Sequence, residues 1–479
     1  MKKKVLLSSI ATIALCLCLI AGSTFALFTS KSEVNIAVTS GNVDVVATVE
    51  NFKYYSVEAD PNGTIIDENG GKYKCVDRTT AGTFANGGTA VPNGSMINLE
   101  RITPGDGISF EIQAKNESDV AIQCRYIIQC VSGEELMEGL VVYINDDAFP
   151  VLKSYTSAWT ALAVGESITD SGNIEIAVEL PVTAGNEYEN KEVAINVLVE
   201  AVQGNADIGA NNGPVIEFLA NSNATAVSDA ASLQAALDNA VAGENTIVVT
   251  GDIVGDVTAT QKADVKTTIE GNGYTFAGAL TVDGKSARYA TAGLTIKNFN
   301  FETDSLSKDA YINLGVSGNS NTRYTNNVTV KGCTFSYSGA EDKVAVKSYT
   351  GGDKNLTLDG LTVNAGMHSM LQVTNVEEGL KITDCKVNAK NGINLNNTPA
   401  LEMSGCEFDT VGYCVRFGVN GSTNNGTFTI ANSTLISAND DGDAVIILRG
   451  TMTGATLTLT NTTLTGTPDI TGSANIVNN

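Results

Sequence analysis

A short phrase of alternating apolar and polar residues recurs in the second half of the chain. Each copy reads apolar, polar, apolar, polar, then Asn, Gly or Asp, and closes on an apolar residue three positions later. Successive side chains of a strand point to opposite faces, so each copy predicts a strand. The copies begin about every 21–34 residues, which is typical of stacked-coil proteins. They are Leu294–Phe301, Val328–Phe335, Leu356–Val363, Leu380–Val387, Leu401–Phe408, Phe428–Leu435 and Leu457–Leu464.

The fifth position of the phrase predicts a sharp corner. Only Asn, Gly and Asp occupy it, and these residue types tolerate the left-handed backbone conformation. A strand, a corner and a second strand in every repeat describe one coil of a parallel β-solenoid. We therefore expect a β-helix over residues 224–479, with rungs to about residue 464. The corner residues are Asn298, Gly332, Gly360, Asp384, Gly405, Asn432 and Asn461.

Residues 229–242 carry the strongest helical pattern of the chain. Leu233, Leu237 and Val241 share one apolar stripe, Ser228 or Asp229 can cap the start, and Gly243 can supply a left-handed stop. Since the helix precedes the first rung, we expect it to cap the open end of the solenoid.

The first half of the chain predicts a different β-fold. Half-buried strands with alternating apolar residues are separated by turns rich in Gly, Pro, Asn and Asp, which indicates an antiparallel sandwich over residues 27–205. The Asn/Gly-rich stretch 206–223 predicts a linker. The clearest of these strands are 108–114, 120–130, 174–180 and 193–199.

The N-terminus has the organisation of an export signal. Lys2–Lys4 precede the apolar run Val5–Ile20, and small residues lead to a cleavage site after Ala26, so residues 1–26 predict a signal peptide. The alternative is a retained membrane anchor, although the run is short for one. We expect a mature protein without a membrane span, secreted to the cell surface or extracellular matrix.

Charge narrows the range of partners. The chain has 29 basic and 53 acidic residues and a net charge of −24. Such an acidic surface argues against nucleic acid or anionic lipid and favours cations or basic surfaces.

The cysteine pattern predicts buried, reduced thiols. Cys333, Cys385 and Cys406 occupy the same position of the repeated phrase, and no dense disulfide pattern is present. Neighbouring rungs would bring Cys385 and Cys406 to about 5 Å at Cα, so a disulfide is the alternative. Parallel Cβ directions on stacked rungs suit such a bridge poorly.

Several motifs of the first half resemble one family. The exit Gly22–Thr29, the turn Ile102–Asp106 and the segments Leu180–Tyr188 and Val199–Asn205 resemble the TasA/camelysin-like proteins, which Gram-positive bacteria export through a SipW-type signal peptidase. The resemblance covers residues 1–205 and implies a jelly-roll sandwich in extracellular fibres or biofilm matrix. Some members are described as metallopeptidases, but this half contains no histidine, the usual zinc ligand.

A second resemblance concerns the other half. The helix followed by the strand Asn245–Ile253 is similar to the start of pectate-lyase-like right-handed β-helix domains, over about residues 229–464. This resemblance implies an architecture and no particular reaction.

Candidate catalytic residues are few. His368 is the single histidine, and Arg416 and Arg449 are the basic residues that a lyase would have to use. Asp440, Asp441 and Asp443 form a tight turn, a calcium site or a catalytic acid pair. We therefore expect no catalysis and no cofactor other than calcium at these three aspartates.

The outward positions of the rungs offer a binding surface. Lys297 and Lys331 lie beside a row of threonines, which would bind a sugar or ice or serve as a solvated β-surface. The threonines are Thr295, Thr329, Thr357, Thr429 and Thr458.

The expected function is that of a non-catalytic adhesin or biofilm-fibre protein. Its partners would be matrix proteins, a glycan, or other copies that assemble when residues 27–38 add a strand to a neighbour's sheet. The alternatives are a calcium-dependent polysaccharide lyase or hydrolase and a glycan-binding module, both on the β-helix.

Overall fold

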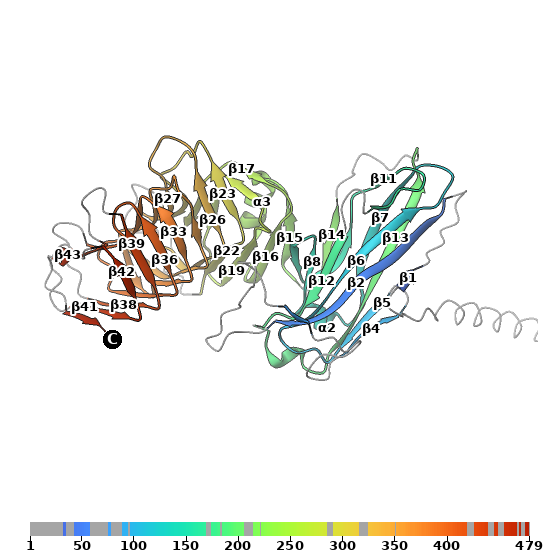
Figure 1. Cartoon of the computed structure of the whole chain (residues 1–479), viewed down its shortest axis with the longest axis horizontal. Helices are drawn as coiled ribbons and strands as arrows, with labels where there is room; N and C mark the ends of the chain where they lie inside the picture. Colours follow the sequence, from blue (N-terminus) through green and yellow to red (C-terminus); the bar gives the residue numbers. More distant parts are fainter. Residues whose placement is uncertain are drawn as a thin grey trace, which may run out of the picture. The chain divides into compact units, whose positions relative to one another are not determined.

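The chain divides into two compact units, Met1–Ser222 and Asn223–Asn479 (Figure 1). The computed structural model describes most of the chain, and the regular secondary structure of that part is almost entirely β-strand. The described residues are 32–34, 43–57, 75–77, 89–93, 96–168, 174–182, 184–205, 214–220, 222–284, 291–315, 324–349, 351–418, 426–438, 445–448, 455–466, 469–470 and 475–478.

Two antiparallel sheets of seven strands each form the first unit. One has the order β1-β2-β6-β12-β8-β9 with β3 beside β2, and the other the order β14-β10-β7-β13-β5-β4 with β11 beside β7. The strands are β1 Ser32–Val34, β2 Val45–Val57, β3 Cys75–Asp77, β4 Thr89–Asn93, β5 Met96–Glu100, β6 Asp106–Asn116, β7 Ile122–Ser132, β8 Val141–Ile144, β9 Asp147–Pro150, β10 Leu152–Thr156, β11 Thr160–Leu162, β12 Ile174–Glu179, β13 Glu192–Gln203 and β14 Val215–Phe218. Two short helical turns, α2 Glu134–Met137 and η2 Asn186–Tyr188, lie between strands.

The alternating pattern of the first unit buries one face of each sheet. Ile108, Phe110 and Ile112 of β6 are at most 2% exposed, while the residues between them are less buried. Phe149 of one sheet contacts Tyr155 of the other at 5.4 Å between ring centroids. The predicted antiparallel sandwich is therefore present, as expected for strands with period-two burial.

The linker predicted at 206–223 is wrong in its second part. β14 lies inside it, pairs antiparallel with β10, and belongs to a sheet of the first unit. This strand begins directly after Pro214, has only four residues and includes Glu217, so the Asn and Gly residues before it dominate the sequence pattern.

Three parallel sheets form the second unit, and successive coils contribute one strand to each sheet (Figure 1). This arrangement is β-helix-like, as the repeated phrase predicts. Sheet A, with 12 strands, contains β15 Ala224–Val227, β16 Gly243–Val249, β19 Val265–Glu270, β22 Gly293–Lys297, β25 Asn326–Lys331, β28 Gly351–Asp359, β31 Asn375–Glu378, β32 Lys381–Thr383, β35 Ala400–Ser404, β38 Thr427–Ala431, β41 Thr456–Thr460 and β44 Asn475–Asn478.

The other two sheets have nine strands each. Sheet B contains β17 Ile253–Val254, β20 Thr275–Ala277, β23 Asn300–Thr303, β26 Thr334–Tyr337, β29 Thr362–Val363, β33 Lys386–Ala389, β36 Glu407–Thr410, β39 Thr434–Ser437 and β42 Thr463–Thr465. Sheet C contains β18 Val257–Thr260, β21 Leu280–Asp283, β24 Ala310–Leu314, β27 Val344–Ser348, β30 Ser369–Val373, β34 Asn391–Leu395, β37 Val415–Phe417, β40 Ile446–Leu448 and β43 Asp469–Ile470.

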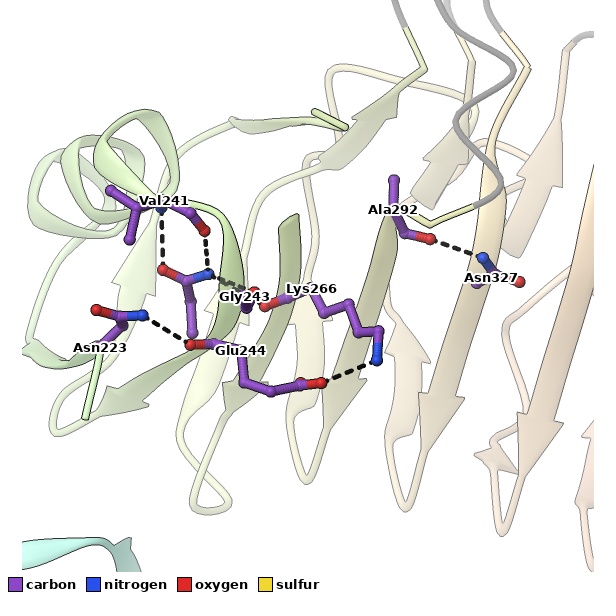
Figure 2. A network of polar contacts seen from close by, with 8 residues as sticks. Asn223, Val241, Gly243, Glu244, Lys266, Ala292 and Asn327 are labelled. Carbon is purple, nitrogen blue, oxygen red and sulfur yellow. Dashed lines mark hydrogen bonds and ion pairs between the residues drawn. The ribbon is translucent and has the colours of Figure 1, made fainter. Parts of the chain in front are cut away.

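The predicted corners lie between sheets A and B, and all of them are left-handed. The backbone φ angles run from 48° at Asn432 to 66° at Gly405. A second series of left-handed residues, which the sequence pattern did not reveal, lies within or between strands of sheet A at Asn327, Asn355 and Gly379. There the Asn355 amide donates to Oδ1 of Asn327 at 2.8 Å, and the Asn327 amide donates to the carbonyl of Ala292 (Figure 2).

At four of the A–B corners, the next residue is a small, buried hydrogen-bond donor. Cys333, Cys385 and Cys406 are 0% exposed, and each thiol lies 3.2–3.4 Å from the carbonyl two residues earlier. Ser433 makes the same contact through its hydroxyl. The cysteines are free thiols, as predicted, and no Cys385–Cys406 disulfide forms. Burial raises the pKa of Cys333 to about 12, so this thiol stays protonated at neutral pH.

Helix α3 spans Ala230–Asn239 and is shorter than the predicted 229–242. Asp229 caps its start by accepting from the Ser232 amide, and Leu233 and Leu237 are buried in the core of the second unit. Val241 does not continue the apolar stripe and is 52% exposed.

Helix α3 ends early because the side chain of Asn245 bonds to the backbone that follows the helix. The side chain of Asn245 accepts from the Val241 amide and donates to the carbonyls of Val241 and Gly243. These bonds hold residues 241–243 outside the helix, because the same backbone groups are no longer available for helical pairing. Figure 2 shows this network beside the ion pair in which Lys266 Nζ lies 2.9 Å from Glu244 Oε1.

A buried carboxylate begins the A–B corner series. Glu270, with a side chain 1% exposed, accepts from the side-chain amide of Asn298 at 2.8 Å and lies 2.7 Å from Lys297 Nζ.

Replacing Glu270 by alanine (Glu270→Ala) should lower the free energy of unfolding by about 1–3 kcal/mol, because Asn298 loses its partner inside the corner. Urea denaturation followed by circular dichroism measures this loss. Glu270→Gln keeps an oxygen for Asn298 and should lose less; equal losses for both variants would contradict the role of that bond.

Candidate functional site

Several predicted site residues lie outside the described residues. These are Asp440, Asp441 and Asp443 of the expected calcium site, Arg449, and the cleavage site at Ala26. Within the described ranges, no three His, Cys, Asp or Glu side chains gather in a way that could hold a metal ion. In the same ranges, no helix is both long enough and apolar enough to cross a membrane.

The threonine row of sheet A exists and is longer than predicted. Register places Thr246 and Thr268 ahead of Thr295, Thr329 and Thr357 on successive strands. Lys381 and Glu402 then interrupt the row before it resumes at Thr429 and Thr458.

The two lysines beside this row are paired with carboxylates. Lys297 Nζ lies 2.7 Å from Glu270, and Lys331 Nζ lies 3.0 Å from Asp359. The hydroxyl row is therefore flanked by neutralised ion pairs. This arrangement fits the solvated-surface interpretation of the threonines better than a ligand site.

A more distinctive row runs along sheet C. Strand register places Asn313, Lys347, Gln372, Asn394 and Arg416 at one position of successive strands. Because side chains alternate along a strand and the residues on both sides of Asn394 are buried in the core, this row faces away from the core. We call these five residues the sheet-C row.

Unpaired polar atoms concentrate in sheet C and in the residues beside its strands. Of eight buried side-chain nitrogen or oxygen atoms without a hydrogen-bond partner among the described residues, six belong to sheet C strands or to residues directly beside them. A buried polar atom left unpaired costs about 1–3 kcal/mol, and native structures leave few. The six are Asn313 Oδ1, His368 Nδ1, Ser369 Oγ, Asn394 Oδ1, Asn396 Oδ1 and Arg416 Nε.

The lysine of the row is already neutralised. Lys347 Nζ lies 2.8 Å from Asp309 Oδ2 and 4.9 Å from the centre of the Tyr349 ring. The same carboxylate accepts from the Tyr349 hydroxyl at 3.1 Å. The hydrogen bond and charge of Lys347 hold the pKa of Asp309 below its ordinary value, so this carboxylate is ionised at neutral pH.

Arg416 is held by an aromatic ring. Its guanidinium carbon lies 5.7 Å from the centre of the Tyr413 ring, which is 4% exposed. Among the described residues no carboxylate forms an ion pair with Arg416. A fixed guanidinium with an unpaired Nε–H is suited to donate to an oxygen acceptor.

His368 is more enclosed than a loop position suggests. Its side chain is 20% exposed, and Nε2 lies 4.0 Å from Asp342 Oδ2. Burial lowers the pKa of His368 below its ordinary value, so the imidazole is neutral at pH 7. Its buried Nδ1 adds one more unpaired atom beside Ser369.

The sequence pattern did not reveal the sheet-C row, although each member is visible in the sequence. The row offers amide oxygens and one guanidinium on successive coils. These groups can bind a polar ligand through hydrogen bonds.

No family model, curated protein or solved structure matches this chain. Fold and site therefore define its class: an all-β protein with an antiparallel two-sheet unit and a parallel β-helix-like unit that carries an outward polar row. The resemblances to TasA/camelysin-like and pectate-lyase-like proteins rest on the motifs quoted for them.

Proposed function

We propose that this chain is a non-catalytic protein of the cell surface or extracellular matrix whose second unit holds a glycan on the sheet-C row. The observation that carries the proposal is the concentration of unpaired polar atoms in sheet C, three of which belong to the row: Asn313 Oδ1, Asn394 Oδ1 and Arg416 Nε. Sugars present hydroxyl groups along their whole length, and a regular succession of hydrogen-bonding side chains is complementary to such a chain.

The proposal also includes export of the chain from the cell and assembly of its copies into fibres. The signal-like residues 1–26 and the TasA-like motifs support secretion through a SipW-type peptidase and a jelly-roll connection of the first unit. The buried Leu233 and Leu237 of α3 support a cap on the β-helix, and the general preference for right-handed crossovers supports its hand. β1 pairs with β2 at a sheet edge, where residues 27–38 would instead join a neighbouring copy and extend a fibre.

Glycan binding tests the main proposal. The mature chain, screened by calorimetry against soluble oligosaccharides, should bind at least one, and Asn394→Leu should weaken that binding by about tenfold because a buried hydrogen bond is lost. Thr429→Val on sheet A is the matched control and should leave the affinity unchanged. Absence of binding to every glycan would refute this function.

The same samples separate binding from turnover. Chromatography of the bound glycan should recover it intact. Shortened products would instead favour the polysaccharide lyase or hydrolase alternative. Calcium-dependent turnover that is lost when Asp440, Asp441 and Asp443 are replaced by asparagine would assign the metal to those residues.

Microscopy tests the assembly step. Mature protein that forms fibres should stop doing so when residues 27–38 are deleted, since the donated strand is gone. Fibres of unchanged length would contradict strand addition.

A further inference from the structure

The unpaired atoms of the sheet-C row differ in what they require from a ligand. Two of them are amide oxygens, on Asn313 and Asn394, and Asn396 adds a third directly after β34; an amide oxygen can only accept a hydrogen bond. The orientation of Asn313 is fixed, because its Nδ2 donates to the carbonyl of Ala310 at 2.8 Å and leaves Oδ1 as the unpaired atom. Asn313 is 2% exposed, so neither bulk water nor a bound sugar reaches its oxygen, and the half-buried Asn394 and Asn396 are the amides that a ligand can approach.

Among the described residues, the row offers an anionic ligand one positive charge without an ion pair, that of Arg416. Lys347 is neutralised by Asp309, and the buried Lys343 next to β27 is paired with Glu341 at 2.6 Å. The whole chain carries a net charge of −24, which repels a polyanion before contact. A carboxylate or sulfate would also bring acceptors against the acceptor oxygens of Asn394 and Asn396.

We infer that the ligand of the sheet-C row is an uncharged, hydroxyl-rich glycan, an inference that rests on the proposed glycan-binding function. A sugar hydroxyl donates one hydrogen bond and accepts others. One class of group therefore satisfies both the amide oxygens of Asn394 and Asn396 and the donor Nε of Arg416. Ionised carboxylates and sulfates satisfy the guanidinium alone.

Two substitutions at Asn394 distinguish the ligand classes. Asn394→Asp keeps the shape and the acceptor oxygen but removes the amide donor and adds a negative charge. Asn394→Leu keeps the approximate volume and removes both. The mature chain and both variants are titrated with neutral glucan, mannan and xylan oligosaccharides, and with oligogalacturonate and oligoalginate of matched length.

The expected result is binding of at least one neutral oligosaccharide and weaker or undetectable binding of the acidic ones. Asn394→Asp should hold the neutral ligand within about threefold of the parent, while Asn394→Leu should lose about tenfold. Affinity for the neutral ligand should not change between 50 and 500 mM NaCl in this assay, because no ion pair is formed.

Each other outcome has a distinct meaning. Preference for an acidic oligosaccharide, lost in Asn394→Asp, overturns the inference and leaves the glycan-binding function standing. Binding of neither set refutes the proposed function itself, and unchanged affinity in Asn394→Leu shows that ordered water alone satisfies the row. Thermal unfolding of each variant checks folding; if Asn394→Asp fails to fold, Asn396→Asp and Asn396→Leu replace the pair.

Discussion

Replacing Phe301 by alanine is expected to lower the free energy of unfolding of the second unit by about 3–5 kcal/mol, the usual cost of removing a buried aromatic side chain. Phe301 is 0% exposed, and its ring stacks on Phe335 at 4.9 Å and 2° and on Phe276 at 5.2 Å. The substitution leaves a cavity between three coils, and the surrounding strands cannot close it without breaking their register.

Urea denaturation followed by far-ultraviolet circular dichroism measures the effect. Val254→Ala is the matched control, because Val254 lies in the same sheet but is 72% exposed, and it should change stability by less than about 0.5 kcal/mol. A loss below about 1 kcal/mol in Phe301→Ala would show that the aromatic stack is dispensable.

A substitution at the corner residue Gly405 should lower the free energy of unfolding nearly as much as Phe301→Ala. Gly405 has a φ of 66°, and a Cβ placed there would collide with Oδ1 of Asp384, the corner residue of the neighbouring coil. Gly405→Val combines the left-handed penalty of about 1–2 kcal/mol with overpacking strain of about 1–3 kcal/mol, so a loss of roughly 2–5 kcal/mol is expected in the same denaturation experiment.

The matched control for this corner is Asn432→Gly, since Asn432 occupies the equivalent position with a φ of 48°. Glycine adopts that conformation without strain, so the change should be small and limited to the loss of the bond from the Asn461 amide at 3.3 Å. If Asn432→Gly destabilised the protein as much as Gly405→Val, left-handed geometry would not be the factor that selects these residues.

The sequence was informative wherever one coil resembles the next. The residue pattern that includes Asn298 and Phe301 repeats with few changes, because every copy must form the same corner and bury the same position. Local chemistry alone therefore predicted the strands of sheets A and B between residues 294 and 464, apart from β31. Among the earlier coils only β16 was predicted, within residues 245–253, because the others, including β19, lack the complete phrase.

The sheet-C row could not be read from sequence for a physical reason. The connections before and after sheet C differ in length from coil to coil, so Asn313, Lys347 and Arg416 fall at irregular intervals although they are neighbours in register. Loops tolerate such variation because they do not share in the repeating hydrogen bonds. The row is therefore regular from strand to strand in the folded sheet, although its members are unevenly spaced along the chain.

The stacking of parallel sheets also determines how the second unit would respond to a pulling force. Hydrogen bonds between coils point along the stacking direction, and each junction has only short pairings, such as the four residue pairs of β23 with β26. Tension along the stack would therefore be resisted at one junction at a time, and coils would separate in sequence. The long pairing of β13 with β7 in the first unit would meet tension along its strands as shear over many bonds at once. A matrix protein built from both units would combine an element that yields gradually under load with one that resists until it ruptures.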